Sequence, residues 1–139
     1  MTSPNVRQVR LKWSGEGLVF RGGPDGVPEV TIDSDAEQGP SPTHALLIAL
    51  AGCMAVDVKM ILEKSRVLVE SIEVEAVGER AESAPRRFLS ITLTYDVRGP
   101  GGEDAKKVQR ALDLSRDKYC SVLHSLDPGI KIDLRVRDE

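Results

Sequence analysis

Residues 39–64 decide the fold, and they read GPSPTHALLIALAGCMAVDVKMILEK. After Pro42 this run contains no helix breaker except Gly52, so it predicts a long central helix over residues 41–65. Ser41 is a suitable N-cap, and Pro42 suits the first helical position, where its missing N–H is not needed. The first half of the helix is apolar on every side, so other elements must surround it. A chain of 139 residues can hardly do this alone, which favours packing against a second subunit.

The segment before the helix, residues 1–33, is expected to form a meander of three strands. Val9, Leu11 and Trp13 alternate with charged residues, the period of a strand with one buried face. A Gly- and Pro-rich turn cluster then separates a second strand, around residues 18–20, from a third over residues 30–33.

The segment after the helix, residues 66–139, is expected to supply two strands, a second helix and a last strand. Apolar residues alternate over 72–76 and 89–97, and they recur at helical spacing from Ala105 to Ser115. A short helical piece is expected at 121–126 and the last strand at 130–136. This order favours an α+β fold of antiparallel hairpins with segregated helices, formed by one domain over residues 1–139.

Composition and motifs exclude several functional classes. The formal net charge is −3, so no surface for nucleic acid or anionic membranes is indicated. The apolar run at 45–56 is too short to cross a bilayer, and the first residues do not resemble a signal peptide, so we expect a cytoplasmic protein. Gly-x-Gly-x-x-Gly, Walker and Gly-x-Ser-x-Gly motifs are absent, which leaves nucleotide binding and serine hydrolysis without support.

The two cysteines are the main candidates for chemistry, either as inert core thiols or as a redox pair. Cys53 lies about ten residues inside the central helix, where the helix dipole does not activate it and a small buried thiol is common. Cys120 lies at a helix start, which predicts the lower pKa of the two. A disulfide needs Cα atoms within about 7 Å, and sequence spacing does not decide whether this is met.

The other polar residues near the cysteines have simpler interpretations. His44 and His124 are expected to form local hydrogen bonds at helix ends, and neither has partners at metal-ligand spacing, so no metal site is predicted. Asp57 is the first charged residue after Cys53 in the helix. We interpret it as facing solvent or a subunit contact.

Two motifs resemble a known family. The segment 39–53 resembles the signature stretch of the OsmC/Ohr family, which carries its peroxidatic cysteine, and residues 55–58 resemble the continuation seen in a YhfA-like branch. The segment 120–126 is similar to the context of the second family cysteine. Since the order of elements also agrees along nearly the whole chain, the sequence is identified as a member of this family, closest to the YhfA-like branch.

The resemblance implies an intertwined homodimer, in which antiparallel six-stranded sheets wrap around two long central helices. It also implies a thiol-dependent peroxidase that needs no metal, flavin or other cofactor. The Cys53 thiolate attacks a peroxide, becomes a sulfenic acid and is resolved by Cys120 as a disulfide, which a dithiol or lipoyl-type reductant then reduces. An apolar pocket at the subunit interface would favour organic hydroperoxides.

The sequence departs from the family pattern where the reactive thiolate is held. In the well-characterised branches a glutamate near the start of the helix and an arginine from the early hairpin do this. Here Thr43 and His44 stand at the helix positions, and the hairpin lacks an arginine until Arg21. Arg21 and His44 are therefore the candidate activators. Two alternatives stay open: a noncatalytic module that binds a small hydrophobic ligand at the dimer interface, and a redox-switched interaction protein.

Overall fold

A computed structural model describes residues 5–137 of the chain. It divides into two units, Met1–Leu46 and Leu47–Glu139, and the division falls inside the long helix α1.

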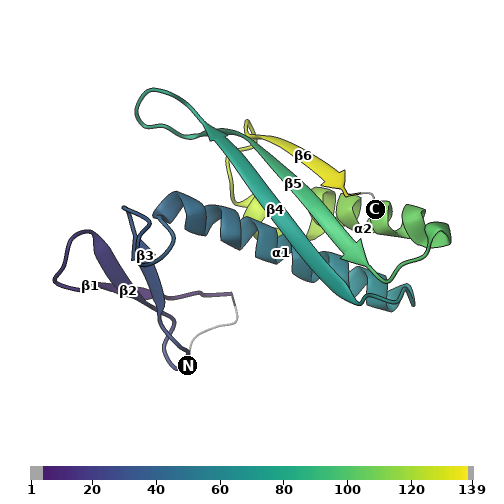
Figure 1. Ribbon diagram of the computed structural model, residues 1–139, viewed down its shortest axis with the longest axis horizontal. Helices are drawn as coiled ribbons and strands as arrows, with labels where there is room; N and C mark the ends of the chain where they lie inside the picture. Colours follow the sequence, from purple (N-terminus) through teal and green to yellow (C-terminus); the bar gives the residue numbers. More distant parts are fainter. Residues whose placement is uncertain (1–4, 138–139) are drawn as a thin grey trace. The chain divides into compact units, whose positions relative to one another are not determined.

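The first unit is built on a three-stranded antiparallel sheet, drawn in purple and dark blue in Figure 1. Its strands β1 (Arg10–Trp13), β2 (Val19–Gly23) and β3 (Val30–Asp33) pair in chain order, as the sequence predicts. The expectation that one face of the first strand is buried is wrong within this chain, because Leu11 and Trp13 are 51% and 53% exposed. The unit contains only the first turn of α1 besides the sheet, and one turn is too short to cover it.

Helix α1 (Pro42–Lys64) begins at the predicted cap. The Ser41 hydroxyl oxygen accepts a hydrogen bond from the backbone N–H of His44 at 3.2 Å, and the Ser41 N–H donates to Nδ1 of His44 at 3.2 Å. This reciprocal pair resembles a capping box with histidine in place of the usual glutamate. The local helix-end role that the sequence predicts for His44 is thus confirmed.

The second unit contains the sheet β4 (Ser71–Arg80), β5 (Phe88–Arg98) and β6 (Lys131–Val136), paired in that order. Strands β4 and β5 are antiparallel, as predicted, but β5 and β6 are parallel. The prediction of antiparallel hairpins alone is therefore wrong for the last strand. Parallel neighbours need a long crossover connection, and η1 (Gly102–Asp104), α2 (Ala105–Leu114), η2 (Ser115–Tyr119) and α3 (Ser121–His124) supply it.

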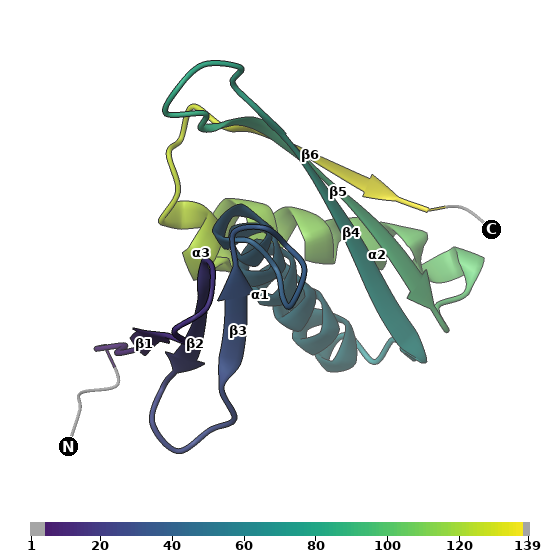
Figure 2. The same ribbon diagram turned by 60° about the vertical axis from the view of Figure 1, so that its left-hand side comes forward.

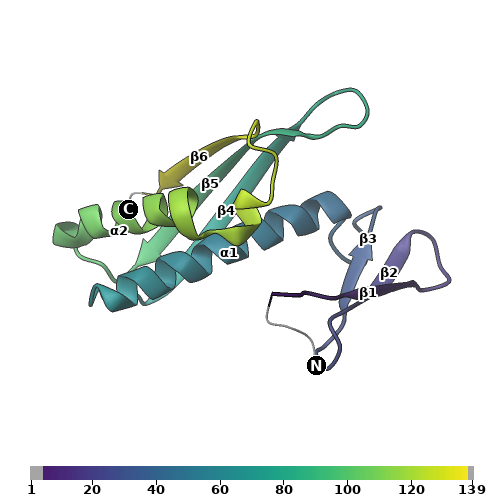
Figure 3. The same ribbon diagram turned by 180° about the vertical axis from the view of Figure 1, so that it is seen from behind.

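The core of the second unit lies between this sheet and its helices. Figures 2 and 3 show α2 and the part of α1 from Leu47 onward on the same face of the sheet. Every fourth residue of α1 is buried there, and β5 presents alternate side chains to it, as its period predicts. The fully buried side chains of these two elements are Leu50, Met54, Val58, Leu62, Ile91, Leu93 and Tyr95.

The opposite side of α1 is apolar but uncovered in the single chain. Ile48, Val56 and Met60 are 61%, 57% and 50% exposed. The helix has 23 residues and by length and hydropathy would also suit a membrane span. One such helix is weak evidence for a membrane span, and here one side of it packs on the sheet.

Candidate functional site

The structure brings Cys53 and Cys120 together from α1 and from the start of α3. Their sulfurs and a carboxylate oxygen of Asp57 all lie within 4.8 Å of one another. Both cysteines are free thiols. The two cysteines that the sequence singled out therefore share one site, formed entirely within the second unit.

The position of Cys120 follows from how α2 ends. The helix continues into the π-helical turn η2, and Cys120 then turns to an extended conformation with its N–H donating to the carbonyl of Ser115 at 2.9 Å. The Cys120 sulfur accepts a hydrogen bond from the N–H of Leu123 at 3.3 Å, which makes this side chain the N-cap of α3. The thiol is fully buried.

Burial decides the acidity of Cys120. Loss of hydration raises the pKa of this thiol to about 11, although the hydrogen bond from Leu123 acts to lower it. Cys53 and Asp57 add to the rise, since a thiolate beside other negative groups is disfavoured. The prediction of a low pKa from the helix start is wrong, because α3 has only four residues and offers the sulfur little beyond one N–H.

Cys53 is the more accessible of the two thiols. It is half-buried, whereas Cys120 is fully buried. Its sulfur lies 4.0 Å from the hydroxyl oxygen of Ser121, the first residue of α3. A small molecule in solvent can therefore reach Cys53 before Cys120.

Asp57 also belongs to the site, which its interpretation from the sequence as a solvent or subunit contact did not indicate. It follows Cys53 by four residues, so both side chains lie on one face of α1. The fully buried Ser115, the first residue of η2, donates a hydrogen bond from its hydroxyl to Oδ2 of Asp57 at 2.9 Å, which ties η2 to α1. The four-residue spacing was visible in the sequence, but the approach of Ser115 and Cys120 to that face was not.

Tyr95 of β5 is a second residue that the sequence did not indicate. It is fully buried, and its hydroxyl forms no hydrogen bond with any residue that the structure describes. Burial raises the pKa of Tyr95, and the nearby Cys120 and Asp57 raise it further. The side chain is therefore a protonated phenol beside the thiol site.

The two predicted activators lie in the first unit, where their contacts are local. Nη2 of the exposed Arg21 donates to Oε1 of Gln38 at 3.0 Å, and His44 caps α1 with Ser41. The activating role of Arg21 or His44 stays a prediction.

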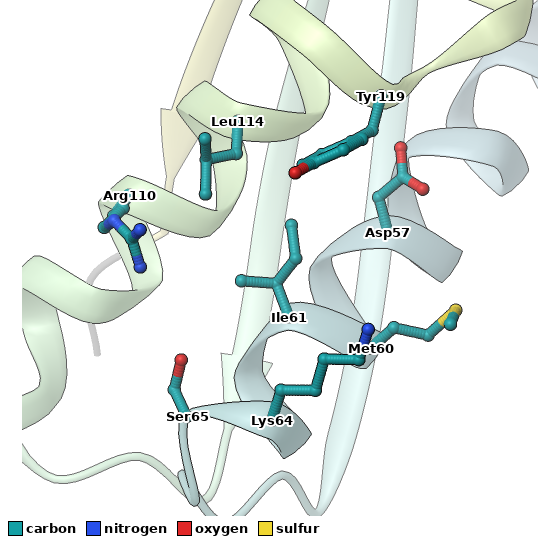
Figure 4. Close-up of a pocket in the computed structure, with 8 residues that line it drawn as sticks. All are labelled: Asp57, Met60, Ile61, Lys64, Ser65, Arg110, Leu114 and Tyr119. Atoms are coloured by element: carbon teal, nitrogen blue, oxygen red, sulfur yellow. The ribbon is translucent and has the colours of Figure 1, made fainter.

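A cleft of about 460 Å³ adjoins the thiol site between the second half of α1 and α2. Figure 4 shows Asp57 and Tyr119 at one end of it, and Arg110 and Ser65 toward the other. Apolar and charged side chains share its walls, unlike the purely apolar pocket that the resemblance implies at a subunit interface. Its lining residues are Asp57, Met60, Ile61, Lys64, Ser65, Arg110, Leu114 and Tyr119.

Comparisons with known proteins place this site in a family. The family model described as OsmC-like protein matches residues 34–135, a range that contains both cysteines. The chain is also 42% identical to Protein YhfA of Escherichia coli (strain K12) over 126 residues, which cover 90% of this chain and 92% of that protein. The chain belongs to the family of OsmC-like proteins.

Solved structures agree with the fold of this OsmC-like protein. An OsmC-like protein from Mycoplasma pneumoniae is similar with a TM-score of 0.82 and 16% identity, over 97% of this chain and 98% of that one. The organic hydroperoxide resistance protein OhrB of Bacillus subtilis is similar with a TM-score of 0.64 and 16% identity, over 97% of this chain and 100% of that one. The α+β OsmC-like fold is thus confirmed, and membership of the family supports a redox or peroxidase-related role.

Proposed function

We propose that this OsmC-like protein is a thiol-dependent peroxidase that reduces organic hydroperoxides, with Cys53 as the peroxidatic residue and Cys120 as the resolving residue. The observation that carries this proposal is the convergence of the two sulfurs within 4.8 Å from separate elements. The family supports a thiol-based redox role. OhrB, which has a similar fold, is an organic hydroperoxide resistance protein, and this similarity supports the substrate class.

The chemistry takes two steps. The Cys53 thiolate attacks one oxygen of the hydroperoxide, the O–O bond breaks, and the alcohol leaves with a proton, so Cys53 becomes a sulfenic acid. The sulfur of Cys120 then attacks the sulfenic sulfur, its proton leaves with the hydroxide as water, and a disulfide forms. A dithiol or lipoyl-type reductant returns both residues to thiols.

Burial and acidity support this division of roles. Cys53 is half-buried and open to a substrate. With a pKa of about 11, Cys120 is a thiolate in only ~10⁻⁴ of molecules at pH 7, so it does not compete for peroxide. It reacts once the sulfenic acid stands beside it, when the two sulfurs need no diffusion to meet.

Activation of Cys53 needs a group other than Asp57. Asp57 is the charged residue beside this thiol, and its negative charge does not stabilise a thiolate. We propose Arg21 or His44 for this role, since a cation near the sulfur favours its ionised form.

We also propose that the protein works as a cytoplasmic homodimer. The exposed apolar residues Ile48, Val56 and Met60 on α1 and Leu11 and Trp13 on β1 offer surfaces for a second subunit. Two free thiols suit a compartment that keeps cysteines reduced.

A thiol titration tests the peroxidase. Reduced protein given one equivalent of cumene hydroperoxide is expected to lose both free thiols in one step. Cys120→Ser is expected to stop at a Cys53 sulfenic acid that a dimedone reagent traps, and Cys53→Ser to keep its remaining thiol. Unchanged thiol content in the wild-type protein after minutes would reject the proposal.

The cleft beside Asp57 favours one second candidate, a noncatalytic module that binds a small molecule with apolar and charged parts. Native mass spectrometry of the purified protein would then show a bound ligand that Cys53→Ser retains. Peroxide turnover by the wild-type protein would reject this candidate as the main function.

A further inference from the structure

We propose that the reduced protein binds one thiophilic divalent cation, such as Zn²⁺, through Cys53, Cys120 and Asp57. The three donor atoms, two sulfurs and a carboxylate oxygen, lie within 4.8 Å of one another. Two thiolates and a carboxylate suit Zn²⁺, and three protein ligands leave its fourth position for water. This binding goes beyond the peroxidase, since it requires only reduced thiols and no peroxide.

The donor atoms are close to the spacing of a tetrahedral site. With Zn–S bonds of about 2.3 Å and a Zn–O bond of about 2.0 Å, the three donors of such a site lie roughly 3.5–3.8 Å apart. The separations here are within 4.8 Å, so they exceed this spacing by at most about 1 Å. Side-chain rotations of Cys53 and Asp57 can close that gap, because both residues are only half-buried.

The carboxylate of Asp57 has an outer hydrogen-bond donor, as carboxylate ligands of metals commonly do. The Ser115 hydroxyl donates to Oδ2 at 2.9 Å, while within residues 47–137 Oδ1 accepts no hydrogen bond. A metal-bound carboxylate is commonly held in this way by an outer hydrogen-bond donor, which fixes the direction of its free oxygen. Ser115 is fully buried, so this donor is held in the core beside the carboxylate.

The charges around the site also favour a cation. Within residues 47–137, no lysine, arginine or histidine forms an ion pair with Asp57. Lys64 and Arg110 line the adjoining cleft, in which Figure 4 shows Asp57 at the end away from Arg110. If both thiols ionise beside this carboxylate, three negative charges lie close together in a partly buried site, which is unfavourable. One divalent ion neutralises two of these charges.

Metal binding and disulfide formation exclude each other at this site. On binding, each thiol releases its proton to solvent and its sulfur lone pair forms the bond to the metal. A disulfide has no thiolate left to donate, so only the reduced protein holds the ion. A bound ion would likewise occupy the sulfur that attacks peroxide.

The test uses the full-length reduced protein after removal of metals with a chelator. We expect titration with Zn²⁺ against a chromophoric competitor to show one ion per chain. Titration with Co²⁺ should give thiolate-to-cobalt charge-transfer bands and the visible bands of a tetrahedral complex. The charge-transfer intensity should correspond to two thiolates and vanish in the disulfide form. If the wild-type protein binds no ion, or if its spectrum shows fewer than two thiolates bound to the metal, the proposal is overturned.

Two matched variants test the carboxylate. Asp57→Asn keeps an oxygen that can accept from Ser115 but removes the charge, and it should weaken Zn²⁺ binding at least tenfold. Asp113→Asn changes a half-buried aspartate on α2 that pairs with Arg116 and should bind Zn²⁺ as the wild-type protein does. Equal affinity of Asp57→Asn and wild type would remove Asp57 from the site. Peroxide consumption is measured separately in excess chelator, so failure of the metal site and of the peroxidase are distinguishable.

Discussion

The pKa of Cys120 gives the sharpest test of how the fold sets the roles of the two thiols. The perturbation is Cys53→Ser, which leaves Cys120 as the single cysteine and keeps a side chain of similar size. Burial, the largest cause of the raised pKa, is unchanged, while the smaller contribution of Cys53 is lost. We therefore expect a midpoint in the folded protein that stays well above 9.0 and lies somewhat below about 11.

The consequence for reactivity is large. At pH 8 a thiol with a pKa of 11 is ionised in ~10⁻³ of molecules, against ~10⁻¹ for a thiol at its ordinary value of 9.0. The assay follows thiolate absorbance in the ultraviolet and the rate of alkylation as pH rises. The same variant unfolded in urea serves as control, and its midpoint should return to about 9. A folded midpoint at or below 9 would refute burial as the controlling effect.

Three further predictions concern stability, each measured by urea unfolding at a fixed protein concentration. The folded pKa of Cys120 exceeds its unfolded value of 9.0, so the unfolded chain loses this proton first as the pH rises. The free energy of unfolding should therefore fall by about 2–3 kcal/mol between pH 9 and 11. Cys120→Ser should not show this fall. Tyr95→Phe removes a buried hydroxyl that bonds to no residue the structure describes, so it should stabilise the fold by about 1 kcal/mol, whereas the exposed Tyr119→Phe should change stability little. Destabilisation by Tyr95→Phe would mean that the hydroxyl is hydrogen-bonded. Ser41→Ala removes the cap of α1 and should cost about 1 kcal/mol, with Ser41→Asn retaining the cap; equal loss in both variants would contradict the capping role.

Local sequence patterns predicted most of the secondary structure. The alternation over 89–97 predicts β5, and the Ser41-Pro42 pair predicts the start of α1, because strand period and helix capping depend on neighbouring residues. The parallel pairing of β6 was not predictable in this way. It depends on which strand the chain meets after the crossover of α2 and α3, and this is decided by packing of distant residues.

The site shows the same division between local and distant effects. The motifs around Cys53 and Cys120 identified the candidate pair, and the structure brings the two sulfurs together. The local pattern predicted a lowered pKa for Cys120, but this pKa is raised, because burial outweighs one N–H at the start of a four-residue helix. Ser115 and Tyr95 carry no sequence signal for the site, because only the packing of η2 and β5 against α1 brings them there.

The most direct measurement is the intact mass and peptide map of the reduced, metal-free protein after one equivalent of cumene hydroperoxide. We expect each chain to lose two hydrogens, with one crosslinked peptide pair that joins Cys53 to Cys120 within the chain and one equivalent of the alcohol released. An unchanged mass, or added oxygen on Cys53 with Cys120 still a thiol, would contradict the proposed pairing of the two sulfurs.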